Sequence, residues 1–370
     1  MSSPGVVALL QELVRIPSVN PDGDPGTDGI GEARIAEFLE AWLRGLGAEV
    51  ELRDVEPGRP NVLARFPTNG EGKPKLLLAP HTDTVSVLGM TVDPFAAELR
   101  DGRVWGRGTS DTKGSMAAML WALEQVGAGL ADLSHEIWFA GLMGEEAGLQ
   151  GSKALAAEEE FDFVIVGEPT ELQTVHATKG CAWVTIRSNG HAVHASQPER
   201  GTNAILQMAD VVRVLSEEVK SELDGLSDPL LGAPTMNVGV IAGGSKVNIV
   251  PDRCELKVDF RTIPGQSLRG VWERLRAIRP ELELDVFESA PMNTSADHPV
   301  IRTLESLGAN CTGAPWFCDG AMFAERGMPA VALGPGSIAQ AHTEDEFIAV
   351  TDLEAGGEFF ERFLRRLGRG

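Results

Sequence analysis

A histidine and an aspartate follow an apolar run in the segment LLLAPHTD, residues 76–83. In an extended chain, residues i and i+2 point the same way, so Asp83 can accept a hydrogen bond from one ring nitrogen of His81 while the other binds a metal. Such a carboxylate fixes the tautomer of a metal-ligating histidine and raises its basicity. Taken alone, the spacing is more typical of a capping aspartate beside a surface histidine.

Three further segments carry carboxylates at comparable positions. Asp111 lies in GRGTSDTKG (106–114) at the entrance of an expected helix, where alone it would be typical of a helix cap or an anion nest. Glu145 and Glu146 follow the run FAGLMG, and Glu168 follows VIVG. Adjacent side chains diverge, so one glutamate of the pair can bind a metal while the other faces a substrate. A solvated helix start would look similar.

A second histidine, His342, ends the loop segment GPGSIAQAH after another apolar run. Together, the five segments place two histidines and several carboxylates just beyond the strand ends of one sheet, the edge at which open α/β sheets bind ligands. Imidazole and carboxylate ligands without thiolates suit zinc in a catalytic site, with manganese or cobalt as substitutes. The glycines of 106–114 match neither common phosphate-loop pattern, so such a loop is rejected.

The helices and strands that must position these residues follow two different sequence patterns. Helices are expected at 4–16, 29–47 and 114–126, and buried strands at 61–66, 75–79, 136–142 and 164–166. After residue 175, alternating strands at 182–188, 235–242, 252–261 and 283–288 are interspersed with helices at 203–223 and 267–278, and the C-terminal part returns to the first style with a strand at 330–334 and a helix at 351–367. The sequence therefore predicts an α/β catalytic domain at 1–176 and 289–370, with a mixed, mostly parallel sheet flanked by helices, and an inserted α+β domain, ferredoxin-like, at 177–288.

Composition narrows the class of protein. The 370 residues include 54 acidic and 32 basic side chains, a net charge of −22, which disfavours nucleic acid and anionic membranes as partners. No segment is apolar enough to span a bilayer, and the first residues do not fit a signal peptide. Four scattered cysteines make no disulfide framework. A cytoplasmic protein is expected.

In this combination of motifs, the chain resembles, over nearly its whole length, the acetylornithine deacetylase, succinyl-diaminopimelate desuccinylase and carboxypeptidase G family of dinuclear zinc amidohydrolases. The resemblance implies two zinc ions, bridged by Asp111, with a cis peptide bond after it. It also implies that Asp83 orients His81 and that Glu145 is the general base. The metal ligands that it implies are, for the first zinc, His81 and Glu168, and for the second, Glu146 and His342.

The inserted domain resembles the lid and dimerisation domain of that family, which implies a homodimer. In GHAVHAS (190–196), position favours His194 as the histidine that polarises the scissile carbonyl, often that of the partner subunit, and leaves His191 as a packed or surface histidine. Asn248 and Arg261 resemble residues that hold the substrate's carboxylate. An exposed salt bridge is the alternative for Arg261.

The resemblance implies hydrolysis of the amide bond of an N-acyl-L-amino acid. Two zinc ions would lower the pKa of a shared water, Glu145 would take its proton and later protonate the leaving amine, and zinc and His194 would hold the oxyanion. The segment GPGSIAQAH looks most similar to the acetylornithine deacetylase branch. The best substrate is therefore an N-acetylornithine-type amide, which would place the enzyme in arginine biosynthesis.

Three alternatives stay open. Many relatives carry T-D-x-R where this chain reads CDGAM at 318–322, and the missing arginine weighs against a substrate with a second carboxylate, such as succinyl-diaminopimelate. The rival within the enzyme class is an exopeptidase that cleaves dipeptides or acyl-glutamates. A non-catalytic, metal-free binding protein is the third, although it should have lost a ligand or the base, and all six positions are filled.

Overall fold

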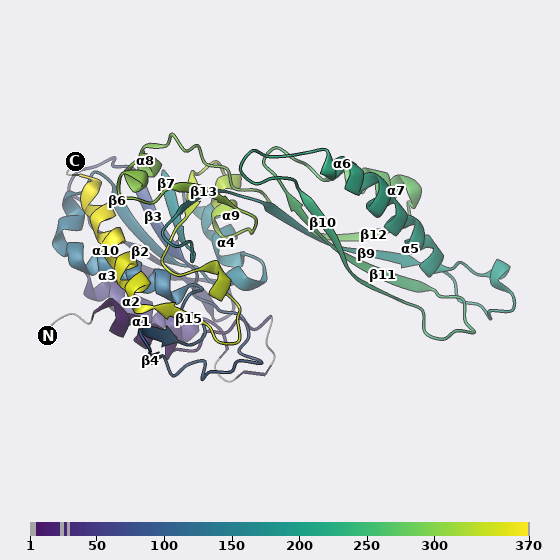
Figure 1. Ribbon diagram of the computed structural model, residues 1–370, viewed down its shortest axis with the longest axis horizontal. Helices are drawn as coiled ribbons and strands as arrows, with labels where there is room; N and C mark the ends of the chain where they lie inside the picture. The colour runs from purple at the N-terminus through teal and green to yellow at the C-terminus, as the bar shows by residue number, and fades with distance from the viewer. Residues whose placement is uncertain (1–4, 23–25, 28–29, 369–370) are drawn as a thin grey trace. The chain divides into compact units, whose positions relative to one another are not determined.

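The computed structural model describes residues 5–22, 26–27 and 30–368, and the chain divides into two compact units, each with its own sheet and helices (Figure 1). Unit 1 comprises Met1–His176, Asn293–Thr312 and Cys318–Gly370, and unit 2 comprises Ala177–Met292 and Gly313–Phe317. Unit 2 thus extends past the expected boundary at 288. The segment Gly313–Phe317, expected in the catalytic domain, packs instead with the inserted unit.

The sheet of unit 1 is mixed and has eight strands in the order β1-β2-β6-β3-β7-β14-β8-β13. Its centre is parallel, because β6, β3, β7 and β14 pair in that sense, whereas β2 and β8 join it antiparallel. The strands are β1 Glu49–Glu56, β2 Arg59–Arg65, β3 Lys75–Pro80, β6 Glu136–Gly141, β7 Phe163–Gly167, β8 Thr174–Thr178, β13 Cys311–Ala314 and β14 Ala330–Ala332. A smaller sheet pairs β4 Glu98–Arg100, β5 Arg103–Trp105 and β15 Phe347–Ala349.

Burial of both sheet faces explains the apolar runs of the central strands. In β3, Leu76 and Leu78 belong to the core formed with α1, α3 and α10, and Leu77 between them is also fully buried. Because each face needs an apolar residue, the run has no polar alternation. The helices of unit 1 are α1 Val6–Val14, α2 Ala33–Gly45, α3 Lys113–Val126, α4 Gln150–Glu158, α8 Pro299–Ser306, α9 Gly320–Glu325 and α10 Val350–Arg366, with short 3-10 turns at η1 Gly127–Asp132, η2 Glu145–Ala147 and η5 Ile338–Gln340.

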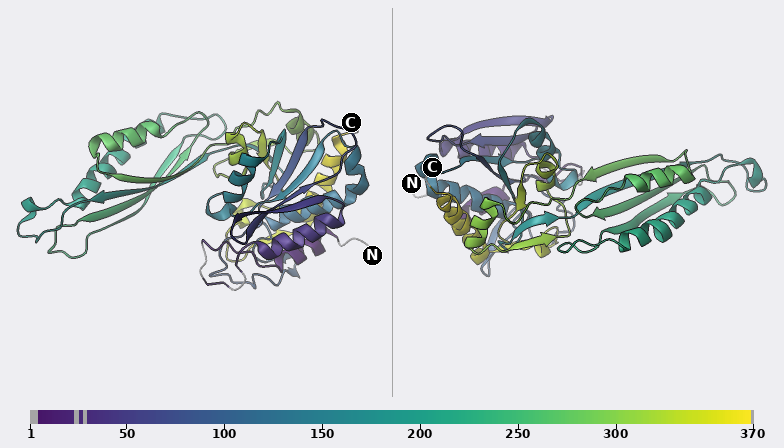
Figure 2. Two further views of the ribbon diagram at one scale, coloured as in Figure 1. Left: turned by 180° about the vertical axis from the view of Figure 1, so that it is seen from behind. Right: turned by 90° about the horizontal axis from the view of Figure 1, so that it is seen from above.

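The sheet of unit 2 is antiparallel, in the order β10-β11-β9-β12, and helices cover one of its faces (Figure 2). Val184, Ile186, Leu256 and Val258 point into the core beneath those helices, whereas Trp183 alternates with them onto the other face. The expected two strand–helix–strand halves are confirmed. The elements are β9 Gly180–Asn189, η3 Pro198–Arg200, α5 Ala204–Arg213, η4 Val214–Val219, α6 Lys220–Asp224, β10 Thr235–Gly243, β11 Arg253–Thr262, α7 Arg269–Ile278 and β12 Glu283–Ser289.

Two expected helices begin outside the described residues, because Pro4 and Gly29 are not among them. The helix expected at 203–223 is interrupted by a π-helical stretch, Val214–Val219, between α5 and α6. Within the described part of the chain, no helix has both the length and the apolar character to cross a membrane.

Candidate metal centre

The carboxyl ends of three neighbouring parallel strands position the first candidate ligands. His81 follows β3, Glu145 and Glu146 follow β6 in the turn η2, and Glu168 follows β7. A bridge between His81 and Leu142 continues the pairing of β3 with β6 past the strand ends. Parallel strands end at one edge of a sheet, so residues far apart in sequence lie together there.

His81 is buried and uses both ring nitrogens. Its Nε2 lies 3.1 Å from Oδ1 of Asp111, and its Nδ1 lies 3.4 Å from Oδ1 and 3.0 Å from the backbone oxygen of Asp83. Burial alone would lower the pKa of His81, but the contacts with Asp111 and Asp83 outweigh it and raise the pKa. One nitrogen thus faces an orienting residue and the other faces the candidate metal site.

Asp83 fixes the loop that carries the glutamate pair. Its Oδ1 accepts a hydrogen bond from the amide of Glu145 at 3.1 Å, and its Oδ2 accepts one from the amide of Glu146 at 3.0 Å. The side-chain amide of Asn20 donates a third, to Oδ2, at 2.8 Å. Asp83 therefore orients His81 and at the same time sets the position of both glutamates.

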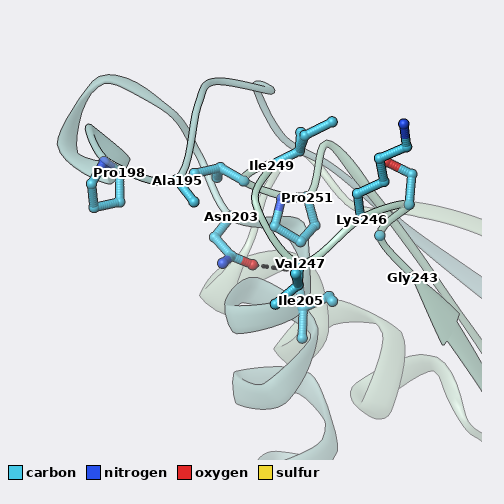
Figure 3. A pocket seen from close by; sticks show the side chains of 12 residues that line it. Ala195, Pro198, Asn203, Ile205, Gly243, Lys246, Val247, Ile249 and Pro251 are labelled. Carbon is cyan, nitrogen blue, oxygen red and sulfur yellow. Dashed lines mark hydrogen bonds between the residues drawn. The ribbon is translucent and has the colours of Figure 1, made fainter.

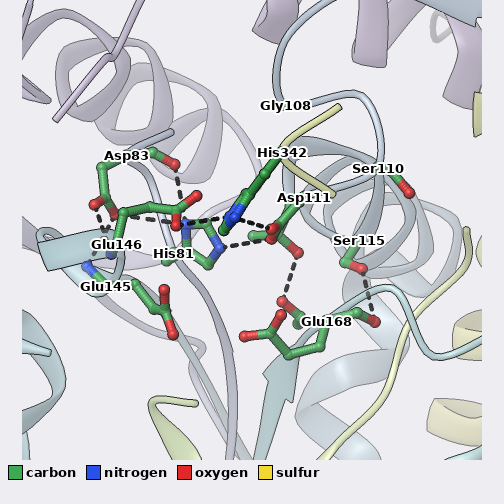
Figure 4. A network of polar contacts seen from close by, with 12 residues as sticks. His81, Asp83, Gly108, Ser110, Asp111, Ser115, Glu145, Glu146, Glu168 and His342 are labelled. Carbon is green, nitrogen blue, oxygen red and sulfur yellow. Dashed lines mark hydrogen bonds and ion pairs between the residues drawn. The ribbon is translucent and has the colours of Figure 1, made fainter. Parts of the chain in front are cut away.

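Two groups of candidate ligands share Asp111 (Figure 4). In the first group, ligand atoms of His81, Asp111 and Glu168 lie within 4.8 Å of one another, and the same holds for Asp111, Glu146 and His342 in the second. His342 Nε2 lies 3.3 Å from Oδ2 of Asp111 and 3.0 Å from Oε2 of Glu146. The structure thus brings together all five predicted ligands in two groups that have Asp111 in common, and the peptide bond after Asp111 is cis, as the resemblance implied.

The electrostatics of this cluster fit divalent cations. Burial and neighbouring carboxylates raise the pKa values of Glu145 and Glu168 well above the ordinary value, and burial and Asp111 raise that of Glu146. The side-chain oxygen Oε1 of Glu146 is buried without a hydrogen-bond partner among the described residues. Several carboxylates gathered out of water need compensating positive charge, and imidazole with carboxylate oxygens is a donor set that zinc accepts.

Glu346 holds the loop that presents Asp111. Its fully buried carboxylate accepts hydrogen bonds from the amides of Ser110 at 2.8 Å and Asp111 at 3.0 Å, and from Gly108 at 3.0 Å. Arg107 Nη1 donates to the same carboxylate at 2.8 Å. Because Glu346 follows His342 by only four positions, one segment supplies a candidate ligand and also fixes the shared one.

Replacing Glu346 with glutamine should destabilise unit 1 and weaken metal binding. The change leaves the Arg107 charge buried without its partner, and breaking a buried ion pair in this way costs about 3–5 kcal/mol. Urea unfolding of the metal-free protein measures the stability. Glu344→Gln, two positions earlier and exposed, is the matched control and should stay within about 0.5 kcal/mol of the parent. Equal stabilities of the two variants would contradict the assignment.

Three residues at this centre were not predicted from the sequence. Asn20 and Glu346 act through the carboxylate and the amides that they contact, and nothing in the run HTEDE separates Glu346 from its exposed neighbours. Asp319 is the third: burial and nearby carboxylates raise its pKa to about 7. Its position in CDGAM, where many relatives carry T-D-x-R, was the available signal.

The remaining predicted residues lie in unit 2. His194 is exposed, and its Nδ1 lies 2.7 Å from Oγ of Ser196. The backbone oxygen of Asn248 accepts from the amide of Ala195 at 3.0 Å, so the two predicted segments are neighbours. The loop that carries Asn248 borders a hollow of about 560 Å³ beside the start of α5 (Figure 3). His191 is exposed, and Arg261 forms an ion pair with Asp259 at 2.9 Å.

Two adjoining sets of imidazole and carboxylate ligands, set at the ends of parallel strands, define the metal-dependent hydrolases as the class. Residues 77–366 match the model of the peptidase family M20/M25/M40. Acetylornithine deacetylase of Proteus mirabilis is 33% identical over 380 residues, with 98% of this chain and 96% of the relative covered. That of Vibrio campbellii is 32% identical, with 94% and 95% covered.

The chain belongs to peptidase family M20/M25/M40. Among solved structures, an M20 family metallo-carboxypeptidase of Sulfolobus solfataricus has the same fold, with a TM-score of 0.78, 22% identity and 99% of both chains covered. A tripeptidase of Staphylococcus aureus matches with a TM-score of 0.77, 23% identity and 98% and 97% coverage. The predicted family, fold class and enzyme class, a metallo-amidohydrolase, are confirmed.

Proposed function

We propose that this chain removes the acyl group from N-acyl-L-amino acids, with N-acetyl-L-ornithine as its reference substrate. The observation that carries the proposal is the position of Asp111, shared by two ligand groups beside Glu145. The curated relatives that match over nearly the whole chain, which are named acetylornithine deacetylases, support the choice of amide and acyl group. With N-acetyl-L-ornithine as the substrate, the reaction would be a step of arginine biosynthesis.

The five ligands would hold two divalent cations, and we propose zinc, with cobalt or manganese as substitutes. His81, Asp111 and Glu168 would hold one, and Glu146 and His342 would hold the other together with Asp111. Two such cations supply Lewis acidity and a lowered pKa for bound water. Asp83 keeps the Nε2 atom of His81 directed at its site, because it contacts Nδ1 on the other side of the ring.

Glu145 would move the proton. In this proposal its carboxylate takes a proton from the attacking water and then delivers it to the nitrogen of the leaving amine. Three facts support this role. Glu145 belongs to neither ligand group, its amide is held by a hydrogen bond to Asp83, and burial together with the charge of Glu168 raises the pKa of its carboxyl group. A proton-transferring group needs such freedom from metal coordination.

Unit 2 would supply substrate contacts. We propose that His194 polarises the scissile carbonyl, and that Asn248 and Arg261 bind the free carboxylate of the amino acid. Exposure of His194 and Asn248 on adjoining backbone segments supports a shared role. Unit 2 would then be a lid and dimerisation domain, and unit 1, into whose sequence it is inserted, would be the catalytic domain. The four cysteines are free, which supports a reducing compartment and hence the cytoplasm.

The reference substrate is tested with zinc- or cobalt-loaded protein and a panel of amides. Release of ornithine from N-acetyl-L-ornithine is expected to exceed, in kcat/KM, the release of products from N-succinyl-diaminopimelate and from dipeptides. We expect a lower kcat/KM for N-succinyl-diaminopimelate, because the arginine of the T-D-x-R pattern, which would suit a second carboxylate, is missing near Asp319. Faster cleavage of dipeptides would contradict the proposal and would favour an exopeptidase.

We also propose a homodimer through unit 2. Strand β10 lies at the edge of its sheet, and Val240 and Ile241 are 52% and 56% exposed. An edge strand with apolar side chains is a template for pairing with another chain. Ile241→Lys is expected to convert the dimer to a monomer in light scattering. Val286→Lys, on the opposite edge strand β12, is the control and should leave the dimer intact; a monomeric parent protein would contradict the proposal.

A further inference from the structure

Three aromatic rings gather at one end of the helix-free face of unit 2. The Trp183 ring stacks on that of Phe287, with centroids 5.2 Å apart, and meets Phe317 edge-on at 5.6 Å. Further along, the same face is polar, because Arg187 pairs with Glu255 at 3.0 Å. Trp183 is nevertheless 40% exposed. Three adjoining rings with an accessible member form a contiguous apolar patch, the kind of surface at which ligands bind.

An arginine stands at the edge of these rings in a fixed orientation. Arg261 donates from Nε and Nη2 to the two carboxylate oxygens of Asp259, at 2.9 and 3.0 Å, and its guanidinium lies 5.3 Å from the centroid of Phe317. Asp259 also accepts from the indole nitrogen of Trp183 at 2.7 Å. Nη1 of Arg261 makes no hydrogen bond with any residue that the structure describes, so one donor group remains for a ligand.

The local charge favours an anion. Lys179 is a second cation near Arg261: burial and the charge of Arg261 lower its pKa, and its Nζ is bonded to the backbone oxygen of Ala233. Arg261 pairs with one carboxylate, that of Asp259, so the two cations Arg261 and Lys179 exceed this single negative charge. A ligand with a carboxylate gains from this excess, whereas an additional ammonium group opposes it.

We propose that Trp183, Phe287 and Phe317 form an aromatic wall that selects N-acyl-L-amino acids with aromatic or large apolar side chains. The inference rests on the proposed hydrolysis of N-acyl-L-amino acids and, within that class of substrates, places aromatic side chains above the ornithine side chain of the reference substrate. The carboxylate and the side chain of an amino acid branch from the same carbon, so a carboxylate on Nη1 of Arg261 brings the side chain to the rings that adjoin it. Asp259 is a positioning residue, because it directs Arg261. An aromatic side chain therefore ranks above the ammonium of ornithine at this wall.

Kinetics of the metal-loaded full chain test the wall. With N-acetyl-L-phenylalanine and N-acetyl-L-alanine as a pair, Trp183→Ala is expected to lower the ratio of their kcat/KM values by about tenfold, mainly through KM for phenylalanine, as loss of an aromatic contact and its buried area requires. Thr185→Ala, on the same strand and face, is the matched control and should keep the ratio. In the parent protein, N-acetyl-L-phenylalanine should exceed N-acetyl-L-ornithine in kcat/KM.

Calorimetry separates this inference from the proposed function. Metal-loaded parent protein should bind 3-phenylpropanoate more tightly than propanoate, and Trp183→Ala should abolish the difference. The aromatic wall is contradicted if the protein hydrolyses acyl-amino acids but Trp183→Ala changes neither the kcat/KM ratio nor the preference for 3-phenylpropanoate over propanoate. It is also contradicted if N-acetyl-L-ornithine is a better substrate than N-acetyl-L-phenylalanine. If no acyl-amino acid is hydrolysed while Trp183→Ala still removes the preference for the ring, the proposed function fails and the wall stands.

The positioning role of Asp259 predicts a specific change in KM. Asp259→Asn should raise KM about equally for all the acetyl-amino acids, with little change in kcat, because Arg261 loses its fixed direction. Asp259→Glu, which restores the charge, should recover part of the affinity. A uniform loss of kcat with an unchanged KM, or a loss that glutamate does not rescue, would overturn the positioning role.

Discussion

Replacing Glu145 with glutamine is expected to lower kcat by about 10²–10⁴-fold, the range that general acid–base catalysis supplies. Glutamine keeps the shape of the side chain but cannot take a proton from water. Because Glu145 belongs to neither ligand group, the variant should bind as much metal as the parent. Metal content by elemental analysis and kcat on N-acetyl-L-ornithine are measured on the same preparation.

A matched control variant tests whether the loss of activity is specific to Glu145. Glu354→Gln, at an exposed position of α10, removes one carboxylate without touching the centre and should keep parent activity. Loss of metal in the Glu145 variant would make it a ligand instead of a base. Activity near that of the parent would remove Glu145 from the mechanism altogether.

The second large effect concerns Asp111, which should control both metal sites. Asparagine at this position loses the charge that both ligand groups share, so bound metal should fall from about two ions per chain to less than one. Metal at a hundredfold excess over its Kd stabilises a folded protein by about 2.7 kcal/mol per site. The rise in Tm that zinc gives the parent should therefore nearly vanish in the variant.

Glu168→Gln provides the contrast, because Glu168 belongs to one ligand group only. This variant should keep one ion and roughly half of the stabilisation by zinc, in proportion to the sites that remain. If Asp111→Asn and Glu168→Gln lose the same amount of metal, Asp111 is not shared between two sites. Titration of each metal-free variant with zinc, followed by Tm, distinguishes these outcomes.

The apolar strands and the alternating strands of unit 2 could be predicted from the sequence, whereas the polar edge strand β1 was not predicted. Runs such as 75–79 have no polar alternation because both faces of β3 are buried. Strand β1, Glu49–Glu56, has the sequence ELRDVE after its first two residues and lies at the edge of the sheet with only Val50 buried. Its pairing with β2 stabilises it, and that contact is tertiary. Local composition therefore gives no sign of such a strand.

The same division holds at the site. The ligands could be predicted because each stands in a motif at a strand end, and the resemblance linked those motifs. Asn20 and Glu346 act on the centre through contacts with Asp83 and with the amides of residues 108–111, which arise only when distant segments pack. A salt bridge of Arg261 could be anticipated from the sequence as an alternative role. Its position beside three aromatic rings could not, because that position arises only when β9 pairs with β11 and β12.

The spread of the ligands along the chain sets the order in which the protein matures. His81 leaves the ribosome long before His342, and all of the segment 177–292 is translated between them. That segment forms its own sheet from nearby strands, so it can fold while the centre still lacks its last ligand. Until Glu346 emerges, the loop of Asp111 has no clamp. The ligand group of Asp111, Glu146 and His342 is therefore expected to be completed late in biosynthesis, whereas His81, Asp111 and Glu168 are all translated before the segment 177–292.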